Sequence, residues 1–329
     1  MLRRLAPSLA ILALALVGCP PAEPAWPSHW EESLRVDASV GAFLSVWGPA
    51  ADEVYAVGGN PAAGVIRRFD GAEWHEEALP VGTPLLNWID GQSGAVWVVG
   101  NEGVALRRGS GGWDRIDTGV DAPLWGVWAA ATDDVWAVGG DTSDPTGQGV
   151  IVHYDGAAWS EVPLPTLDRA SNALFKVWGT SADHVFAVGR SGVILHYDGS
   201  AWTQQPSGVS RDLISLWGTG PDDIVAVGGR SNGVIARWDG SAWSSAVIGE
   251  AAGLNGVWVD GRGRAWVCGV LGVSGVVAPG ALSFDPEMLT TLVLHGSFGI
   301  DGGPHFLVGG TLDGPPPYEG VIYLRGDLP

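Results

Sequence analysis

Charged residues, lysine in particular, are scarce in this sequence. Charged side chains make up 16% of its 329 residues, and acidic residues outnumber basic ones by 36 to 17, for a formal net charge of −19. Lys176 is the only lysine. Nucleic-acid binding depends on cationic groups that neutralise phosphates. The composition therefore excludes a nucleic-acid-binding protein, and we attribute the acidity to the solubility of an exposed surface.

Local signatures of catalysis and of metal or cofactor binding are also missing. The histidines show no metal-ligand spacing, and neither a Gly-x-Ser-x-Gly elbow nor a phosphate-binding glycine loop is present. We therefore assign no catalytic, metal-binding or cofactor-binding residue. Only two cysteines occur. Cys268 lies in an apolar run, where we expect it to pack as a small hydrophobic residue without a disulfide partner.

Glycine and tryptophan, in contrast, are abundant, with 51 and 18 copies, and hydrophobic residues make up 46% of the chain. This combination is typical of short strands, tight turns and large buried aromatic side chains, and it does not describe a disordered chain. A single all-β domain can occupy the whole length.

The N-terminus has the layout of a secretion signal. Two arginines precede an apolar stretch, residues 5–17, that is too short to remain in a bilayer as a helix. Residues 16–19 read Leu-Val-Gly-Cys, which resembles the lipobox of bacterial lipoproteins. The resemblance implies that residues 1–18 are a signal peptide and that Cys19 becomes a lipidated N-terminus carrying several acyl chains, palmitate among them. An ordinary cleaved signal with a chance cysteine is the alternative.

Residues 19–29 are rich in proline, which favours an extended tether. In Gram-negative lipoproteins an aspartate after the lipidated cysteine resembles an inner-membrane retention signal, and Pro20 stands there instead. We therefore expect a monomeric cell-envelope protein, anchored through Cys19 to the lipid bilayer, with the outer membrane favoured. It would face the periplasm or the cell surface.

A repeat of about 40 residues runs through the rest of the chain. A Val-Trp-Gly motif or a close variant recurs, and we call the central residue of this motif the anchor. Eleven residues after each anchor, a glycine closes a short apolar run. Two of the seven anchors are substituted, by isoleucine and by phenylalanine. The anchors are Trp47, Ile89, Trp128, Trp178, Trp217, Trp258 and Phe298.

Two further strands follow the first two in each repeat. They begin with Gly-Val-Ile or a variant, and five copies place a tryptophan ten residues later. Four copies contain an Asp-Gly pair in between, such as Asp155-Gly156. That pair predicts a hairpin with a type I′ turn, in which φ is positive at both central residues. Four strands per repeat predict an all-β fold, a seven-bladed β-propeller over residues 30–329 with four antiparallel strands per blade.

The two ends of the repeat region complete each other. The seventh copy stops before its fourth strand, and residues 30–36 resemble a fourth strand without the three that should precede it. We expect residues 30–36 to pair with residues 320–325, so that the N-terminal strand closes the last blade and removes exposed sheet edges. The repeated tryptophans could form a sugar-binding set, but their fixed spacing favours a packing role shared by all blades.

Insertions in the repeat indicate a candidate ligand face. The loop between the second and third strands is longest in blade 3, at 140–148, and in blade 7, at 310–319, and the connection between blades 3 and 4 is extended over 167–172. Two insertions therefore meet at one junction, on one face. Neutral drift in exposed loops is the alternative. The possible ligand-face residues are Asp141, Asp144, Asp168, Arg169 and Asn172.

The combined Val-Trp-Gly, Ala-Val-Gly and Tyr-Asp-Gly-x-x-Trp pattern resembles the repeats of bacterial lipoproteins assigned to kelch-like or BNR-like propellers. This resemblance implies no particular activity. We expect a non-enzymatic, membrane-anchored binding or scaffolding propeller whose partner is a protein or a glycan. The alternative is a carbohydrate-active propeller enzyme, a glycan hydrolase or lyase. A sialidase-like site would need clustered arginines, and several arginines of this chain fall on third strands, away from the ligand face.

Overall fold

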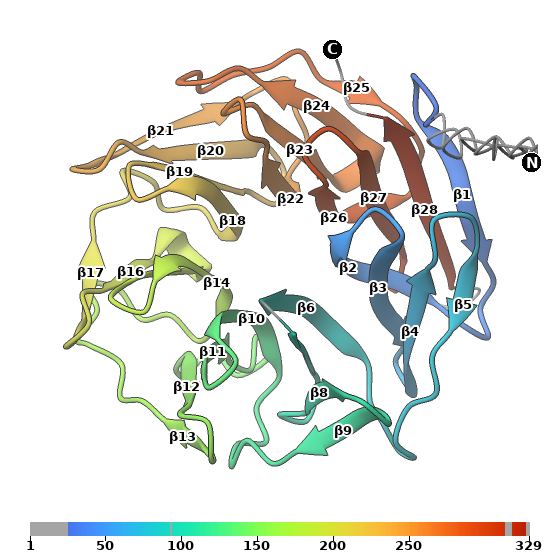
Figure 1. The fold of residues 1–329 in the computed structure, drawn as a ribbon. Coiled ribbons are helices and arrows are strands. Elements are labelled where there is room, and N and C mark those ends of the chain that lie inside the picture. Colours follow the sequence, from blue (N-terminus) through green and yellow to red (C-terminus); the bar gives the residue numbers. More distant parts are fainter. Residues whose placement is uncertain (1–25, 93, 313–317, 327–329) are drawn as a thin grey trace, which may run out of the picture.

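The computed structural model describes residues 26–92, 94–312 and 318–326, and these form a ring of seven four-stranded antiparallel sheets around a central axis (Figure 1). The predicted seven-bladed propeller is confirmed. The alternation of β-branched and aromatic residues with Gly-containing turns produces the strands, and the two 3₁₀ turns, η1 (Arg190–Gly192) and η2 (Val270–Gly272), are the only helical elements of the described residues. No described helix has the length and apolar character needed to cross a bilayer.

Blades 1 to 6 run outward from the axis in chain order, and in blade 7 the N-terminal strand takes the outermost place. Blade 1 comprises β2 (Ala42–Ala50), β3 (Glu53–Asn60), β4 (Ala63–Phe69) and β5 (Trp74–Glu76); blade 2, β6 (Leu86–Gln92), β7 (Ala95–Gly100), β8 (Ala105–Gly109) and β9 (Gly112–Ile116); blade 3, β10 (Leu124–Ala131), β11 (Asp134–Gly139), β12 (Val150–Tyr154) and β13 (Trp159–Glu161); blade 4, β14 (Leu174–Ser181), β15 (His184–Gly189), β16 (Ile194–Tyr197) and β17 (Trp202–Gln205). Blade 5 comprises β18 (Leu213–Gly220), β19 (Asp223–Gly228), β20 (Gly233–Trp238) and β21 (Trp243–Ile248); blade 6, β22 (Leu254–Val259), β23 (Ala265–Gly269), β24 (Val273–Val277) and β25 (Glu287–Met288); blade 7, β26 (Val293–Gly299), β27 (Pro304–Thr311), β28 (Glu319–Gly326) and β1 (Glu31–Val36).

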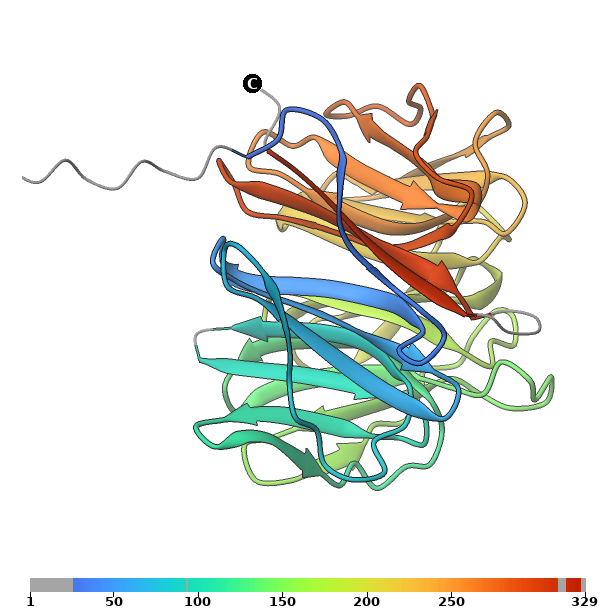
Figure 2. The same ribbon diagram turned by 90° about the vertical axis from the view of Figure 1, so that its right-hand side faces the viewer.

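The N-terminal strand closes the ring as predicted. Strand β1 lies antiparallel to β28, from Glu31 opposite Leu324 to Val36 opposite Gly320. Figure 2 shows β1 running along the outer edge of β28, and in Figure 1 the two strands lie side by side in blade 7. Because β1 covers the edge of β28, the last blade has the same four strands as the others.

An inner set of aromatic side chains joins neighbouring blades near the axis. The ring of Trp128 in blade 3 covers Gly179 of blade 4, where a Cβ would lie 2.9 Å from the indole. Trp178 covers Gly218 of blade 5 in the same way. The Trp-Gly motif therefore has a packing origin, because the indole of one blade fills the space that the missing side chain leaves in the next.

The spacing predicts Ile89 as the anchor of blade 2, and this is wrong by one residue. In blade 1 the anchor Trp47 pairs with Tyr55, three positions before the closing glycine. In blade 2 the residue three positions before the closing Gly100 is Trp97, and Trp97 pairs with Asp90. The β6–β7 hairpin lacks the irregularity that follows Trp47 in blade 1, so it is one residue shorter. A buried aspartate therefore stands where the other blades carry tryptophan or phenylalanine.

An outer set of aromatic pairs confirms the packing role of the fourth-strand tryptophans. Each of these tryptophans meets an aromatic ring on the second strand of the preceding blade edge to face, with ring centroids 5.3–6.4 Å apart and planes at 80–89°. Trp30 is the member from blade 7 and meets Trp266, which ties the N-terminal strand into the series. The other pairs are Trp74–Phe306, Trp113–Tyr55, Trp159–Trp97, Trp202–Trp136 and Trp243–Phe186.

The Asp-Gly hairpins form, but their predicted type I′ turns are wrong. Only the glycine has positive φ, 93° at Gly156, and Asp155 is not in the left-handed region. Four residues separate β12 from β13, and the Asp155 carboxylate accepts hydrogen bonds from the backbone N–H groups of Ala157 and Ala158, at 2.9 and 3.0 Å. The aspartate therefore acts as a side-chain cap of a longer loop, which the dipeptide alone does not distinguish from a two-residue turn.

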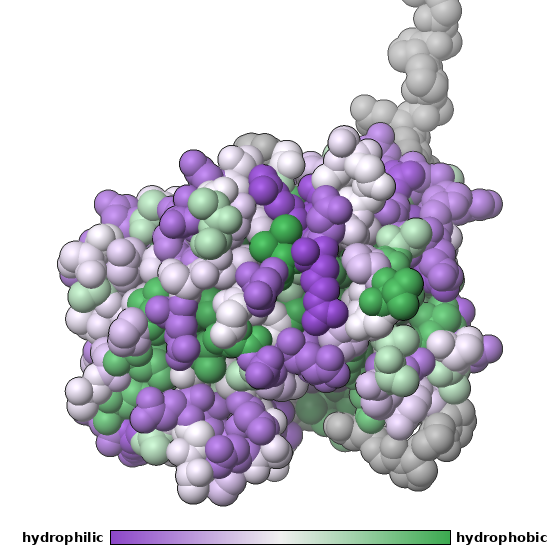
Figure 3. All heavy atoms as spheres, turned by 90° about the horizontal axis from the view of Figure 1, so that it is seen from below, coloured by the Kyte–Doolittle hydropathy of each residue, from purple (hydrophilic) through white to green (hydrophobic). Residues whose placement is uncertain are grey.

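The outer rim is mixed in polarity. Seen from below in Figure 3, hydrophilic side chains are interspersed with small apolar areas. Four large hydrophobic side chains are exposed among the described residues, and the last two of them belong to blade 6: Val81, Val247, Leu271 and Met288. A few exposed apolar residues of this kind are normal on a soluble surface.

Candidate functional site

The loops that join second to third strands, and those that join one blade to the next, share one face of the ring, which we call the loop face. The β11–β12 loop of blade 3 lies on it. Asp141 Oδ1 accepts hydrogen bonds from the N–H and hydroxyl of Ser143, at 2.8 and 2.6 Å, and Asp144 Oδ1 does the same with Thr146, at 2.8 and 2.7 Å. These bonds favour the ionised carboxylates and lower the pKa of both aspartates. Both candidate side chains therefore shape their own loop.

Two side chains from the blade 4 side fasten this loop. The Nδ2 of Asn172 donates to the carbonyl oxygens of Asp141 and Asp144, at 3.0 and 2.6 Å. Its Oδ1 accepts from Arg190 Nη1 at 3.0 Å, and the same guanidinium donates to the carbonyl of Thr142 at 3.1 Å. Asn172 is buried, so its amide holds the loop in place. Sequence reasoning missed Arg190, which has no local signature because its partners are 18 and 48 residues away.

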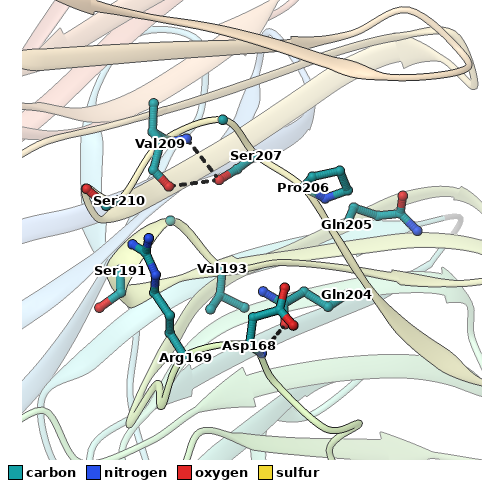
Figure 4. Close-up of a pocket in the computed structure, with 12 residues that line it drawn as sticks. Asp168, Arg169, Ser191, Val193, Gln204, Gln205, Pro206, Ser207, Val209 and Ser210 are labelled. Carbon is teal, nitrogen blue, oxygen red and sulfur yellow. Dashed lines mark hydrogen bonds between the residues drawn. The ribbon is translucent and has the colours of Figure 1, made fainter.

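Asp168 and Arg169 belong to a neighbouring cavity of about 350 Å³ on the same face. Figure 4 shows their side chains on one side of the cavity, opposite the segment that carries Ser207 and Val209. The Asp168 N–H donates to the side-chain oxygen of Gln204 at 2.8 Å, which ties the blade 3 to blade 4 connection to β17. The remaining lining is mostly hydroxyl, amide and backbone groups: Ser191, Gly192, Val193, Gln205, Pro206, Gly208 and Ser210.

The structure thus brings the five ligand-face residues into two adjacent groups. Asp141, Asp144 and Asn172 build the fastened loop, while Asp168 and Arg169 line the cavity. Arg190 and Ser191 are consecutive in η1, so one turn connects the two groups. Ser191 has a positive φ of 60°, an uncommon conformation for a residue with a side chain. Cys19 lies outside the described residues, as do 313–317, the centre of the predicted blade 7 insertion.

The chemistry available at the loop face is that of hydrogen bonding. The cavity carries one carboxylate, one guanidinium, two amides and several hydroxyls, which can pair with the amide groups of an extended peptide or with other polar ligands. Over residues 26–92, 94–312 and 318–326, no group of three or more His, Cys, Asp or Glu is placed to hold a metal ion.

A buried acid–base pair lies on the inner strands of blades 2 and 4. Asp90 and Lys176 are 5% and 4% exposed. Asp90 Oδ2 accepts a hydrogen bond from the Ala129 N–H at 3.1 Å. The Lys176 amine lies over the ring face of Trp88, and it is 3.5 Å from the carbonyl oxygen of Trp125. Asp90, Trp88 and Lys176 together fill the part of the inner ring in which blade 2 lacks its indole.

Burial decides the protonation of this pair. Removal from water disfavours the ionised carboxylate and raises the pKa of Asp90 to about 7, against the opposing effects of backbone hydrogen bonds and of Lys176. The same desolvation holds the pKa of Lys176 well below its usual value, with Asp90 acting in the opposite direction. Groups with perturbed pKa values often mark functional sites, but neither side chain lines the cavity that contains Asp168 and Arg169, so we assign the pair to packing.

Comparisons with known proteins support the fold and go no further. No family model and no curated protein matches the sequence. Among solved structures, "YCF48 bound to D1 peptide" is 14% identical with a TM-score of 0.65, covering 92% of this chain and all of that one. YCF48 from Cyanidioschyzon merolae is 15% identical with a TM-score of 0.66, covering 90% and 98%. The WD40 β-propeller domain of Doa1 is 11% identical with a TM-score of 0.69, covering 90% and 97%. The chain is a β-propeller that resembles the WD40 and YCF48 folds.

Proposed function

We propose that this protein is a lipid-anchored binding propeller of the cell envelope, which holds an extended segment of a partner protein on its loop face where blades 3 and 4 meet. The observation that carries this proposal is the clamp formed by Asn172 and Arg190. Drift in an exposed loop would leave its conformation unsupported. Here three side-chain hydrogen bonds from Asn172 and Arg190 fix the loop beside a polar cavity, and a fourth joins these two side chains to each other.

The lining of the cavity favours a peptide backbone as the ligand. The amides of Gln204 and Gln205 and the hydroxyls of Ser207 and Ser210 can each serve the N–H and C=O groups of an extended chain. The one carboxylate and one guanidinium balance in charge, so affinity would come from hydrogen bonds and shape. A propeller of similar fold, YCF48, has been solved with the D1 peptide bound, which supports the same use of this fold here.

Anchoring through Cys19 would place this face outside the cytoplasm at a membrane surface. The support is the lipobox-like sequence after a short apolar stretch, followed by a proline-rich tether. Replacement of Cys19 by serine should move the protein from the membrane fraction to the soluble fraction and abolish labelling by radioactive palmitate. Retention of the variant in the membrane fraction would contradict the anchoring proposal.

The binding proposal is tested by photo-crosslinking in intact cells. A photoreactive amino acid at Gln205, on the loop face, should yield discrete adducts with a partner, whereas one at Asp155, in an exposed hairpin on the opposite face, should yield none. Addition of Arg190→Ala to the Gln205 protein should reduce the adducts severalfold, because the clamp of the loop is lost. Equal adducts from both faces, or adducts insensitive to the Arg190 change, would contradict the proposal.

A further inference from the structure

A second cleft, of about 390 Å³, lies between blades 6 and 7, away from the loop face. It is within the roughly 300–1,000 Å³ range of small-molecule sites. Beside it, the fourth strand of blade 6 has only two residues, and β24 has paired neighbours on that side only at Val273 and Ser274. The residues that matter below are Trp30, Ser274, Asp285, Glu287, His305 and Arg325, and we call their site the 6/7 cleft.

The repeat itself shows that His305 of the 6/7 cleft is exceptional, whereas the position of Arg325 also carries an arginine, Arg108, in blade 2. His305 stands four positions before the closing glycine of its blade. The same position is aliphatic in all six other blades, and its partner on the third strand is aromatic in four of them. In blade 7 the corresponding pair is His305 opposite Arg325. A local departure from a packing rule that the other blades follow is a sign of a functional site. The aliphatic residues are Val54, Val96, Val135, Val185, Ile224 and Ala265.

The hydrogen bonds of His305 define its tautomer. Its Nε2 lies 3.0 Å from the hydroxyl oxygen of Ser297, and that hydroxyl donates its one proton to the carbonyl of Trp266 at 3.1 Å. The Ser297 oxygen must therefore accept, so Nε2 carries the hydrogen. Burial, together with nearby Arg325, holds the pKa of His305 well below its usual value, so the ring is neutral. Nδ1 is then a hydrogen-bond acceptor.

This acceptor has no donor. His305 is 2% exposed, and its Nδ1 makes no hydrogen bond to the described residues. The imidazole is surrounded by the rings of Trp30, Trp258 and Trp266, with centroids 5.1, 5.2 and 4.4 Å away. A buried acceptor without a donor is unfavourable by about 1–3 kcal/mol. A side chain that is aliphatic in every other blade is thus replaced by one that requires an outside donor.

The other groups of the 6/7 cleft narrow the class of ligand. The Arg325 guanidinium lies over the rings of Trp30 and Trp266, at 5.4 and 5.6 Å. The carboxylates of Asp285 and Glu287 lie on the blade 6 side of the cleft, where they can accept hydrogen bonds. An anion would meet two carboxylates, and a cation would meet the guanidinium. A neutral molecule with many hydroxyls can donate to Nδ1 and the carboxylates, accept from the guanidinium, and place C–H groups on the half-buried Trp30.

We infer that the 6/7 cleft binds a neutral sugar, with a hydroxyl of that sugar donating to His305 Nδ1. Trp30 and Arg325 cap the imidazole in this structure, so the sugar has to displace the guanidinium from the indole faces to reach it. The site is independent of the peptide site proposed on the loop face, since the two clefts share no residue.

Ligand-detected saturation-transfer NMR tests this inference with the full-length protein in a detergent that contains no sugar. The probes are the neutral methyl glycosides of glucose, galactose, mannose and N-acetylglucosamine, with glucuronate and glucosamine as charged counterparts. At least one neutral glycoside should give saturation transfer that exceeds that of the charged probes. Absence of transfer from every neutral glycoside, or preference for a charged probe, would overturn the inference.

Two variants taken from the other blades supply the matched test. His305→Val and Arg325→Tyr restore side chains that the same positions carry elsewhere in the ring, so both should fold. Each substitution should raise the Kd of the glycoside about tenfold or more, which corresponds to about 1.4 kcal/mol of binding free energy. Gln205→Ala on the loop face should leave the Kd unchanged. The melting temperature of His305→Val should not fall, because the variant removes a buried acceptor without a donor. Unchanged glycoside affinity in both variants would overturn the inference.

Discussion

Single residues decide where the two aromatic sets of the propeller are interrupted. The inner set loses its indole at Asp90 in blade 2, and the outer set has the smaller Phe284 near the fourth-strand position of blade 6. At Asp90 the space is filled by polar and aromatic groups, and one carboxylate and one amine are buried together. Such a pair is stable when both groups are uncharged or when they pair as ions. Burial raises the pKa of Asp90 and lowers the pKa of Lys176, and both shifts favour the uncharged forms.

Replacement of Asp90 by asparagine tests this assignment through pH. The pKa of Asp90 is raised from 3.8 to about 7 in the folded protein. The folded state therefore keeps a proton that the unfolded state has lost between about pH 4 and pH 7, and the free energy of unfolding of the wild type falls as pH rises through that window. The substituted amide does not titrate and can still accept the hydrogen bond from Ala129. The free energy of unfolding of the Asp90→Asn variant, relative to that of the wild type, should therefore rise by up to about 4 kcal/mol between pH 4 and pH 8.

Urea unfolding of both proteins at pH 4 and pH 8 measures this gain. Asp121→Asn, the same substitution at an exposed aspartate, serves as the control. Its free energy of unfolding should differ from that of the wild type by the same amount at both pH values. If Asp90→Asn also shows an equal difference, then Asp90 is ionised in the folded protein at both pH values and the buried pair is an ion pair.

At the scale of single residues, the sequence predicts a role only where the pattern that reveals the role is local in the chain. The tryptophans recur at fixed spacing, and that spacing is enough to assign them to packing. Asp90 was hidden because one missing residue in the β6–β7 hairpin shifts the apparent anchor to Ile89. Lys176 contacts residues of other blades, and Arg190 binds a loop of the preceding blade. His305 likewise has its nearest aromatic ring, that of Trp266, on another blade. Contacts between blades depend on how the ring closes, and a single sequence does not specify them.

At the scale of elements, strand order and pairing were accessible from the repeat, whereas the loop conformations were not. Alternating apolar residues and closing glycines predict four strands per blade, and the missing fourth strand of the seventh copy predicts that residues 30–36 pair with residues 320–325. The loops depend on side-chain hydrogen bonds. Asp155 caps a four-residue loop, and the β11–β12 loop is fixed by residues of another blade. The ligand-face residues were therefore identified as neighbours, but their division into loop-building and cavity-lining groups was not.

Arg190 is the residue whose removal should loosen the β11–β12 loop. Arg190→Ala removes the hydrogen bonds to Thr142 and Asn172, so the loop should open more often and its amides should exchange hydrogen roughly tenfold faster. Hydrogen–deuterium exchange of peptides covering residues 140–149 measures this. Arg169→Ala removes the same charge from an exposed position on the same face and should leave the exchange as in wild type. Equal exchange in the two variants would show that the clamp does not order the loop.

At the scale of the whole molecule, a ring of seven sheets is closed by a strand from the other end of the chain. The end of β28 and the start of β1 are close, since the Gly326 N–H donates to the Pro27 carbonyl at 2.6 Å. The two strands are therefore arranged as a hairpin whose connecting turn is absent. Closure depends on strand pairing and on the contact of Trp30 with Trp266, and not on which terminus supplies the strand.

Moving the closing strand from one terminus to the other tests this claim directly. Deletion of residues 26–36 should lower the melting temperature by roughly 10 °C or more, because the contacts of two half-buried tryptophans, Trp26 and Trp30, are lost and one edge of the last sheet loses its partner. The exposed edge of β28 should also cause self-association, visible in light scattering. Placing residues 26–36 after the C-terminus, through a short Gly-Ser turn, restores a hairpin with the native antiparallel register and should recover both properties. A deletion that leaves thermal unfolding unchanged would contradict closure by β1, and a transferred strand that fails to restore stability would show that the N-terminal connection itself is needed.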